Sequence, residues 1–415
     1  MKYETVKLGD ISWINTELYS SKENWTFVNY LDTGNITENT VSEIQHIKIG
    51  EEKLPSRAKR KVKYNSIIYS TVRPNQKHYG IIKEQPDNFL ISTGFAVIDI
   101  DTDKASADYI YFVLTQEKVI EYLHAIAEQS TSAYPSIKPA DLENIEIPLP
   151  SLEYQKRIAS ILVMLNRKID INARISDNLL QQAQAIMTSF FIDFSRFEGT
   201  IPADWEQGTL QDIADFSNGY AFKSRELLNA PESDCYQVFK QGHINRGGGF
   251  NSSGTKSWYP ISKCANLSKY VLHKGDVLMA MTDMKDNVAI LGNTALMTLD
   301  NQYIVNQRVG LLRSNGYKGT SYAYIYLLTN SFDFLKDLRS RANSGVQVNL
   351  SSNEIKRSPV LIASNAVNEE FNALTEPLLT MIMANDIENQ RLATLRDTLL
   401  PKLMSGELDV SSLAL

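Results

Sequence analysis

The chain contains its own pattern twice, and this duplication constrains the fold more than any local feature does. Residues 109 to 191 map onto 322 to 404 with a constant offset of 213, and in both copies a mixed globular segment precedes a long helix-forming segment. Anchors nearer the N-terminus agree at smaller offsets, 202 for residues 3–11 and 210 for residues 66–69. Self-similarity at a long period is typical of repeated architectures, so we predict two similar domains attached to two long helices.

The two helical segments carry apolar residues at spacings of three and four over several heptads, which predicts a seam between helices. The first seam is Ile158, Ile161, Leu165, Lys168, Asn172, Ile175, Leu179, Gln182 and Ile186, and the second is Phe371, Leu374, Leu378, Met381, Asn385, Glu388, Leu392, Leu395 and Leu399. Asn172 and Asn385 are equivalent by the repeat, and each lies near the middle of its helix.

If the two helices pack antiparallel, their midpoints coincide and Asn172 meets Asn385. A buried amide pair fixes the register of a seam, because any slip leaves an amide unpaired among apolar side chains. The alternative is that both asparagines face solvent. Outside this seam, Leu162, Ile169 and Leu180 are expected to pack against helices of a partner.

Proline and glycine indicate where the helices begin and end. Pro148 and Pro150 prevent a helix before residue 151, and the second helix is expected to end between Pro401 and Gly406. Pro377 should kink the second helix or mark a later start. The predicted fold class is α+β, with two pseudo-repeated α/β domains and two long helices that form an antiparallel coiled coil. The predicted boundaries are 1–150 for the first domain, 151–196 for the first helix, 197–362 for the second domain, 363–410 for the second helix and 411–415 for a tail.

Each domain mixes strand and helix patterns. Residues 62–72, 89–100, 270–282 and 303–312 have strand composition, whereas 109–128 and 322–341 show helical periodicity. The aromatic side chains in the first helical stretch, Tyr111, Phe112 and Tyr122, are expected in the core.

Composition and motifs exclude several classes of protein. No run approaches the roughly 18 apolar residues of a membrane span, and no leader precedes Lys7, so a cytoplasmic protein is expected. Cys235 and Cys264 are expected to be ordinary buried thiols, and the five histidines lack ligand spacing, so no metal site is predicted. Nucleotide-binding, hydrolase and adenine-methyltransferase motifs are missing. The glycine cluster at 247–249 indicates a flexible loop, and the chain is predicted to have no catalytic residues.

Charge is unevenly distributed along the chain. The net charge is −6, yet Lys and Arg outnumber Asp and Glu by three in residues 201–362. Residues 48–63 concentrate seven basic side chains, among them Lys59, Arg60 and Lys61. This strip is either a solvated loop or a surface that grips phosphates.

Two helix-end motifs carry a family resemblance. The segment Leu149-Pro150-Ser151-Leu152-Glu153-Tyr154-Gln155-Lys156-Arg157-Ile158-Ala159 and the segment from Leu395 to Leu408 closely resemble specificity subunits of type I restriction-modification systems. The segments 219–224, 66–74 and 190–194 are also similar to family segments, so the resemblance covers nearly the whole chain. Glu388 departs from the family's preference for an apolar seam.

The resemblance implies that the two domains are target-recognition domains and that the helices are the family's spacer helices. It implies double-stranded DNA, two methyltransferase subunits and restriction/translocase subunits as partners. S-adenosylmethionine, ATP and Mg²⁺ would be bound by those partners, with no cofactor in this chain. Two different recognition domains held at a fixed distance by the helices would recognise a bipartite, asymmetric DNA site. A two-headed transcription regulator and a protein adaptor are the alternatives.

Candidate DNA contacts lie in equivalent loops of the two domains. Their side chains can bond phosphates or base edges, although an exposed turn explains them equally well. The candidates are Arg73, Asn75, Gln76 and Lys77 with Lys285 and Asn287 after the mid-domain strands, Ser130, Thr131 and Tyr134 with Ser344 and Gln347 after the helices, the strip residues Lys59, Arg60 and Lys61, and Lys223.

Overall fold

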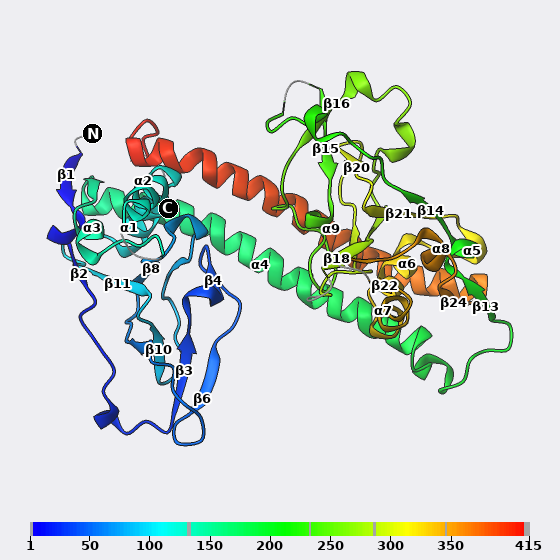
Figure 1. The fold of residues 1–415 in the computed structure, drawn as a ribbon, viewed down its shortest axis with the longest axis horizontal. Helices are drawn as coiled ribbons and strands as arrows, with labels where there is room; N and C mark the ends of the chain where they lie inside the picture. The colour runs from blue at the N-terminus through cyan, green and yellow to red at the C-terminus, as the bar shows by residue number, and fades with distance from the viewer. Residues whose placement is uncertain (1–2, 131–133, 232–233, 285–287, 345–346, 411–415) are drawn as a thin grey trace. The chain divides into compact units, whose positions relative to one another are not determined.

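The computed structural model describes residues 3–130, 134–231, 234–284, 288–344 and 347–410 (Figure 1), with only the backbone described at Ser344 and Gln347. The chain divides into two compact units. Unit 1 comprises Met1–Arg167 and Leu392–Leu415, and unit 2 comprises Lys168–Arg391. Each unit therefore contains one globular domain together with part of both long helices.

Domain 1 is built on two four-stranded sheets. The sheet β2-β11-β8-β9 is antiparallel throughout, whereas β6-β3-β10-β7 contains a parallel pair, β3 with β10. The bounds are β1 Glu4–Lys7, β2 Ser12–Ile14, β3 Phe27–Leu31, β4 Ile36–Thr37, β5 Thr40–Val41, β6 Gln45–Lys48, β7 Ala58–Arg60, β8 Ile67–Ser70, β9 Tyr79–Ile81, β10 Phe89–Ser92, β11 Phe95–Ile100, α1 Ala107–Leu114, α2 Glu117–Glu128, α3 Pro139–Glu143 and β12 Glu146–Leu149.

Domain 2 repeats this topology. Its sheet β14-β21-β17-β19 corresponds to β2-β11-β8-β9, and β16-β15-β20 again contains a parallel pair, β15 with β20. The bounds are β13 Glu206–Thr209, α5 Leu210–Ile213, β14 Ala214–Asn218, β15 Cys235–Phe239, β16 Trp258–Pro260, β17 Val277–Ala280, β18 Thr282–Met284, β19 Thr294–Leu296, β20 Tyr303–Val305, β21 Val309–Ser314, α6 Tyr322–Thr329, α7 Phe332–Ser340, β22 Asn343–Ser344, β23 Gln347–Asn349, α8 Ser352–Lys356 and β24 Pro359–Ile362.

The duplication is confirmed, with one correction to its register. The Tyr109 hydroxyl donates to the Pro148 carbonyl at 2.6 Å, and the Tyr324 hydroxyl donates to the Leu361 carbonyl at 2.5 Å. The acceptors are 213 residues apart, as predicted, but the tyrosines are 215 apart. The constant offset was therefore wrong at α1, and it returns to 213 at α3 and α8 because α7 is shorter than α2.

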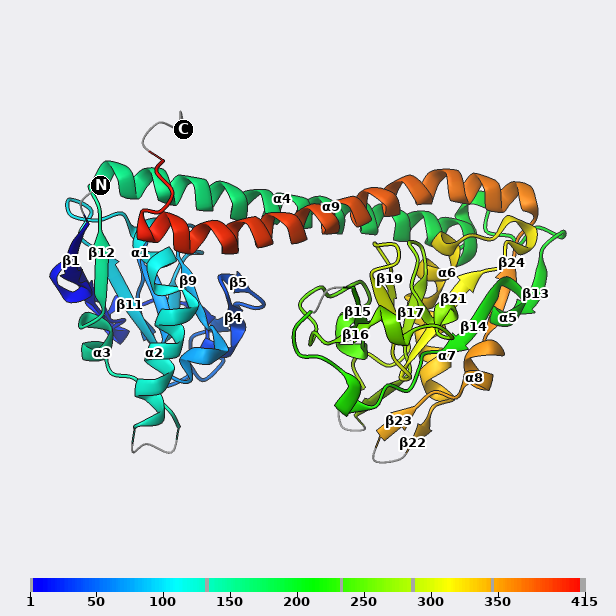
Figure 2. The same ribbon diagram turned by 90° about the horizontal axis from the view of Figure 1, so that it is seen from above.

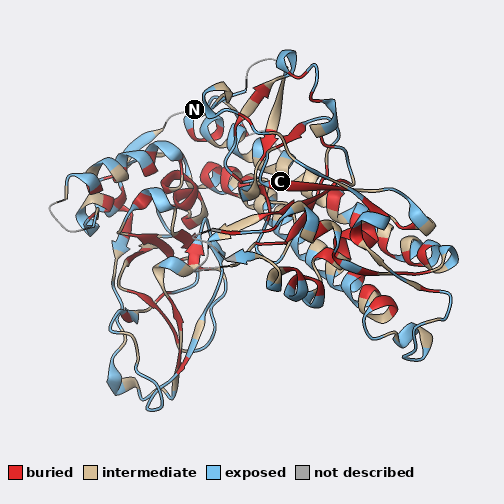
Figure 3. Cartoon of the chain, turned by 45° about the vertical axis from the view of Figure 1, so that its right-hand side comes forward, coloured by how far each residue is buried: buried red, intermediate tan, exposed pale blue. Residues whose placement is uncertain are grey.

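Each domain buries its own core, as the colouring of Figure 3 shows. In domain 1, α1 packs against the antiparallel sheet, and Tyr111 and Phe112 are buried as expected. Tyr122 was predicted in the core but is exposed, because it projects from the outer face of α2. The predicted strands at 89–100 and 303–312 are each two strands, since a turn separates β10 from β11 and β20 from β21.

The long helices are α4 (Leu152–Phe191) and α9 (Asn365–Ser405). They begin after Pro150 and end before Gly406, which has φ +75°, in agreement with the predicted limits. Of the two alternatives for Pro377, the later start is wrong, because α9 passes through this residue, and the kink stays a prediction.

The two helices run antiparallel within each unit, as predicted. In unit 2 the rings of Phe191 and Phe371 lie 5.1 Å apart, while Asn172 bonds to Asn389, so rising numbers in α4 meet falling numbers in α9. In unit 1, Ile161 packs against the same cluster as Leu399 and Leu400 near the end of α9.

The predicted heptad seam is only partly buried. Four of its apolar members are between 41% and 53% exposed, namely Ile175, Leu374, Met381 and Leu395. In contrast, Leu162, which was expected to face a partner, is fully buried in the core of domain 1. The reason is that the helix ends pack onto the domains as well as onto each other, which turns the buried face away from a simple two-helix seam.

Leu162→Ala is expected to destabilise the protein by about 2–5 kcal/mol, because truncation leaves a cavity in the core of domain 1. Met164→Ala, two residues away on the exposed side of α4, should change the free energy of unfolding by less than about 0.5 kcal/mol. Urea unfolding followed by circular dichroism measures both. Equal effects would contradict the assignment of Leu162 to the core.

Candidate nucleic-acid interface

Two loops that the sequence singles out are joined by backbone pairing in each domain. In domain 1 the turn after β8 meets the loop after α2, because Val72 forms an antiparallel bridge with Ser136. In domain 2, Thr282 of β18 pairs with Asn349 of β23 in the same way. These positions are equivalent, at offsets of 210 and 213. Figure 2 shows β22 and β23 at the end of domain 2 that lies away from α9.

The turn after β8 has a strained backbone. Arg73 has φ +47° and precedes the 3-10 turn Pro74–Gln76. Its guanidinium lies over the Tyr134 ring, 5.6 Å from the centroid, and both side chains are exposed. A left-handed conformation costs a non-glycine residue about 1–3 kcal/mol, and such strain clusters at functional sites. Arg73 and Tyr134 are thus presented together with the exposed side chains of Asn75 and Gln76.

Lys77 ends the same turn but is neutralised within the domain. Its Nζ lies 2.9 Å from Glu117 Oε2 and 3.5 Å from Glu38 Oε1. The hydrogen bond to Glu117 is the largest cause that raises the pKa of Lys77. This charge compensation favours a structural role, and a DNA contact by Lys77 stays a prediction.

Five of the predicted DNA contacts are not described by the structure, or are described only by their backbone. Thr131, Lys285 and Asn287 fall outside the described residues, and only the backbones of Ser344 and Gln347 are described. Ser130 is described, and its Oγ lies 3.5 Å from Ser136 Oγ, within the paired loops.

The basic strip, residues 48–63, includes β7 of the sheet β6-β3-β10-β7, and some of its cations make contacts within domain 1. Arg60 Nη2 donates to the Thr93 carbonyl at 3.4 Å, and Lys61 forms an ion pair with Glu23. The side chains of both cations are half-buried, whereas that of Lys59 is exposed. Of these three candidates, Lys59 is therefore the most accessible to a phosphate.

Lys223 follows a motif that the structure explains by packing. A Cβ at Gly219 would lie 2.1 Å from the Asn306 carbonyl oxygen, so only glycine fits there, and Phe222 is buried. Lys223 itself is exposed, 3.9 Å from Glu226. Among the described residues, no hydrogen bond or ion pair links it to the paired loops.

Sequence reasoning missed a residue that ties a third segment to this surface. Gln241, between β15 and β16, donates from Nε2 to the Thr282 carbonyl at 2.5 Å and accepts from the Thr282 hydroxyl at 2.6 Å. In domain 1 the connection between β3 and β6 has the same place, where the Glu38 N–H donates to the Lys77 carbonyl at 2.9 Å. The signal that could have pointed to Gln241 is the repeat itself, because β3 and β15 lie 208 residues apart and the connections that follow them are therefore equivalent.

The predicted register residues meet in one polar cluster in unit 2, although their side-chain amides do not bond to each other. Asn172 is 1% exposed, and its Nδ2 donates to Glu388 Oε2 at 2.7 Å and to Asn389 Oδ1 at 2.9 Å. Asn385 Nδ2 donates to Ser176 Oγ at 3.1 Å and to the Asn172 backbone carbonyl at 3.5 Å. The two asparagines therefore lie side by side as predicted, but the contact between them uses the backbone of Asn172. The alternative prediction, that these asparagines face solvent, is wrong for Asn172, because this side chain is buried.

Glu388, the apparent departure from an apolar seam, has a structural purpose in this cluster. The hydrogen bond from Asn172 is the main cause that lowers the pKa of Glu388, and Lys168 Nζ lies 3.3 Å from its Oε2. Lys168, Asn172 and Glu388, three of the polar positions in the two seams, therefore satisfy one another across the helices.

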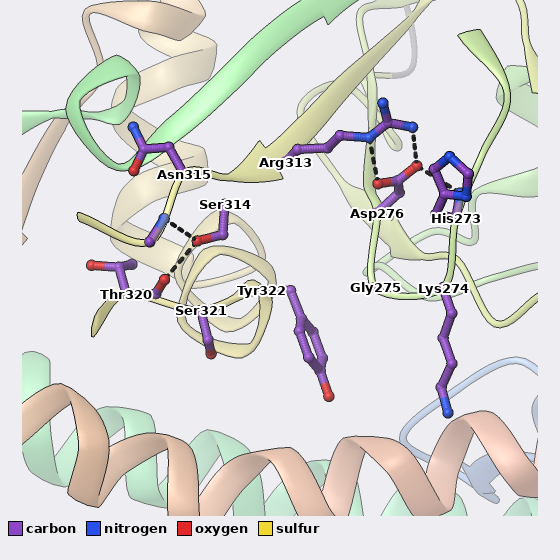
Figure 4. Close-up of a pocket in the computed structure, with 11 residues that line it drawn as sticks. His273, Lys274, Gly275, Asp276, Arg313, Ser314, Asn315, Thr320, Ser321 and Tyr322 are labelled. Carbon is purple, nitrogen blue, oxygen red and sulfur yellow. Dashed lines mark hydrogen bonds and ion pairs between the residues drawn. The ribbon is translucent and has the colours of Figure 1, made fainter. Parts of the chain in front are cut away.

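A shallow hollow of about 680 Å³ opens in domain 2 beside α9 (Figure 4). Arg313 Nε and Nη2 each lie 2.8 Å from an oxygen of Asp276, and this contact raises the pKa of the guanidinium. The pair anchors the end of β21 to the turn before β17. The Tyr322 side chain points toward α9 in Figure 4.

Neither metal binding nor membrane insertion is indicated within the described part of the chain. No group of three or more His, Cys, Asp or Glu side chains there has the arrangement of a metal site. None of the helices described has the length and apolar character needed to cross a bilayer.

Comparison with known proteins places this architecture in a family. The sequence model of one protein family, the type I restriction modification DNA specificity domain, matches residues 1–181 and 202–367 of this chain. The HindI specificity subunit of Haemophilus influenzae is 24% identical over 98% of this chain and 99% of its own length, and the MjaIX specificity subunit of Methanocaldococcus jannaschii is 24% identical over 98% and 88%. A crystal structure of a type I system S subunit from M. genitalium has the same fold, with a TM-score of 0.59, 15% identity and coverage of 97% and 96%. The chain therefore belongs to the type I restriction-modification DNA specificity family.

Proposed function

We propose that this chain reads a bipartite, asymmetric DNA target, with one half-site per domain, as the non-catalytic recognition subunit of a type I restriction-modification complex. The family to which it belongs supplies DNA specificity, and its members are recognition subunits rather than enzymes. The observation that carries the bipartite proposal is the equivalent loop pairing, Val72 with Ser136 and Thr282 with Asn349.

The two domains share this framework but present different side chains on it. Domain 1 offers Arg73, Asn75 and Gln76, whereas β18 of domain 2 consists of Thr282, Asp283 and Met284. Base discrimination depends on the donors and acceptors that face the groove. The two domains are therefore expected to read different half-sites.

Two methyltransferase subunits are proposed to dock on the long helices, with restriction/translocase subunits joining them. These partners would bind S-adenosylmethionine, ATP and Mg²⁺, and the complex would work in the cytoplasm, where DNA is accessible. A surface hollow of about 270 Å³ on α4 supports a docking role, because it is lined by the apolar side chains of Ile171, Ile175 and Leu179. The comparisons lend no support to a transcription regulator.

Asn172 and Asn385 are proposed to set the register of the helix pair. A one-turn slip that placed Asn172 opposite Leu392 would separate it from Glu388 and Asn389 and leave a buried amide without partners. The register in turn would set where the helix ends, and hence the domains, are attached.

Exchanging residues 197–362 for the corresponding domain of another family member is expected to change one half-site only, because each domain carries its own loop pair. Mapping of methylated adenines in cells that co-express the chimera with its methyltransferase subunit gives both half-sites. A change in both half-sites would refute the division of labour.

Arg73→Ala is expected to relax discrimination at one base pair in the half-site read by domain 1, by about 1–3 kcal/mol, because a bidentate donor is lost. Titration of the assembled complex with duplexes substituted at each position measures this. Lys104→Ala removes an exposed lysine that pairs with Asp101 and should leave discrimination unchanged. Unaltered discrimination in Arg73→Ala would remove this residue from base contact.

Asn172→Ala should destabilise the isolated chain by about 1–3 kcal/mol, because Glu388 and Asn389 lose a buried donor. Asn178→Ala is the matched control, because this exposed side chain accepts a hydrogen bond from Gln182 on the same helix. Its effect should stay below about 0.5 kcal/mol. Denaturant midpoints and slopes measure both variants. Similar losses in both would argue against a register role.

A further inference from the structure

We propose that the connection between β15 and β16 of domain 2, residues 240–257, binds the DNA backbone, with Lys240, Arg246 and Lys256 as phosphate contacts. We call this segment the basic loop. The inference rests on the proposed DNA-recognition function and adds to it a surface for which the sequence predicted only a flexible loop.

Charge distinguishes the basic loop from its counterpart. The loop holds three cations and no Asp or Glu, whereas the equivalent connection in domain 1, residues 32–44, holds Asp32, Glu38 and Glu43 with no Lys or Arg. Among the described residues, none of the three cations of the basic loop forms an ion pair with a carboxylate. An uncompensated cation at the surface releases counterions from DNA when it meets a phosphate.

The three cations lie on one ordered segment. The Lys240 N–H donates to His243 Nδ1 at 3.0 Å, and a Cβ at Gly254, two residues before Lys256, would lie 2.8 Å from His243 Cδ2, so both arms of the loop adjoin this ring. Burial is the main cause that lowers the pKa of His243, and the charges of Lys240 and Lys256 lower it further. Arg246 occupies the exposed turn that follows, where the Asn245 N–H donates to the Gly249 carbonyl at 2.9 Å.

The basic loop is held in place, contrary to the expectation of a flexible loop. The Phe250 ring lies 5.9 Å from the rings of both Phe239 and Tyr303 and anchors the loop to the core. The Asn251 N–H donates to the His243 carbonyl at 2.8 Å. A loop that is already ordered loses less conformational entropy when it binds.

A glycine makes this anchoring possible. Gly248 has φ +100°, and a Cβ there would lie 2.5 Å from Asn330 Oδ1. Only glycine combines this backbone conformation with so close an approach to α6. The glycine cluster thus serves packing, and it leaves Arg246 at the tip of the turn.

The basic loop adjoins the paired loops of domain 2. Gln241 bonds at both ends of its amide to Thr282, the first residue of β18, and Thr282 pairs with Asn349. Cations beside the base-reading candidates fit phosphates, which flank the groove.

A protein partner fits the basic loop less well. Its large apolar side chains, Ile244 and Phe250, both pack into the core of domain 2. Protein interfaces depend on exposed apolar and aromatic anchors. The remaining side chains include Ser252, Ser253 and Thr255, which suit hydrogen bonds to phosphate oxygens.

The test uses the full chain assembled with its methyltransferase subunits and a triple variant, Lys240→Gln, Arg246→Gln and Lys256→Gln. Affinity is measured over a salt series for target duplex and for random-sequence duplex. The slope of log affinity against log salt should fall in magnitude by roughly 2–3, at about 0.9 per lost phosphate contact, for both duplexes alike. The sequence preference should be retained.

A matched control separates local contact from overall charge. Lys263→Gln, Lys269→Gln and Lys336→Gln together remove three exposed lysines of the same domain and should leave the slope unchanged. Arg246→Lys keeps the charge and should retain the wild-type slope. Equal slopes for the triple variant and the wild type overturn the proposal.

Two other results are informative in different ways. If the triple variant no longer co-purifies with the methyltransferase subunits, the basic loop is a protein interface and the proposal is wrong. If the wild-type complex binds neither duplex, the DNA-recognition function itself fails, and this failure is visible before any variant is made.

Discussion

The structure depends on one packing constraint, which is that neither domain completes its core without the long helices. In unit 1, Ile158 and Leu162 of α4 and Leu403 of α9 belong to the same buried cluster as the sheet of domain 1. In unit 2, Met187 and Phe371 do the same for domain 2. The helices are therefore structural parts of the domains, and a mutation that repositions a helix end disturbs the core to which it belongs.

This constraint explains what the sequence could and could not predict. The duplication, the helix limits near Pro150 and Gly406, and the polar loops of each domain were all visible in the sequence. The buried face of the helices was not, because heptad spacing identifies apolar positions without saying whether a helix or a sheet covers them. Leu162 was misplaced for this reason.

The candidate site shows a similar limit. Residue types in the turn after β8 pointed to a polar, exposed surface, and Arg73 lies there with Tyr134. Charge compensation was invisible, because Glu38 and Glu117 lie about forty residues on either side of Lys77 in the sequence. Only the folded chain separates such a lysine from the unpaired cations of the basic loop.

The make-up of the two units has a consequence for synthesis of the chain on the ribosome. Unit 2 is one continuous stretch, Lys168–Arg391, whereas unit 1 joins Met1–Arg167 to Leu392–Leu415. The Tyr154 hydroxyl donates to the Leu408 carbonyl at 3.1 Å, and Val410 is buried. Although domains generally fold in the order in which they are made, domain 1 must wait for residues 392–410, which are made after all of unit 2. Until those residues emerge, nascent domain 1 exposes an incomplete core, and products truncated before them would be natural substrates for chaperones and proteases.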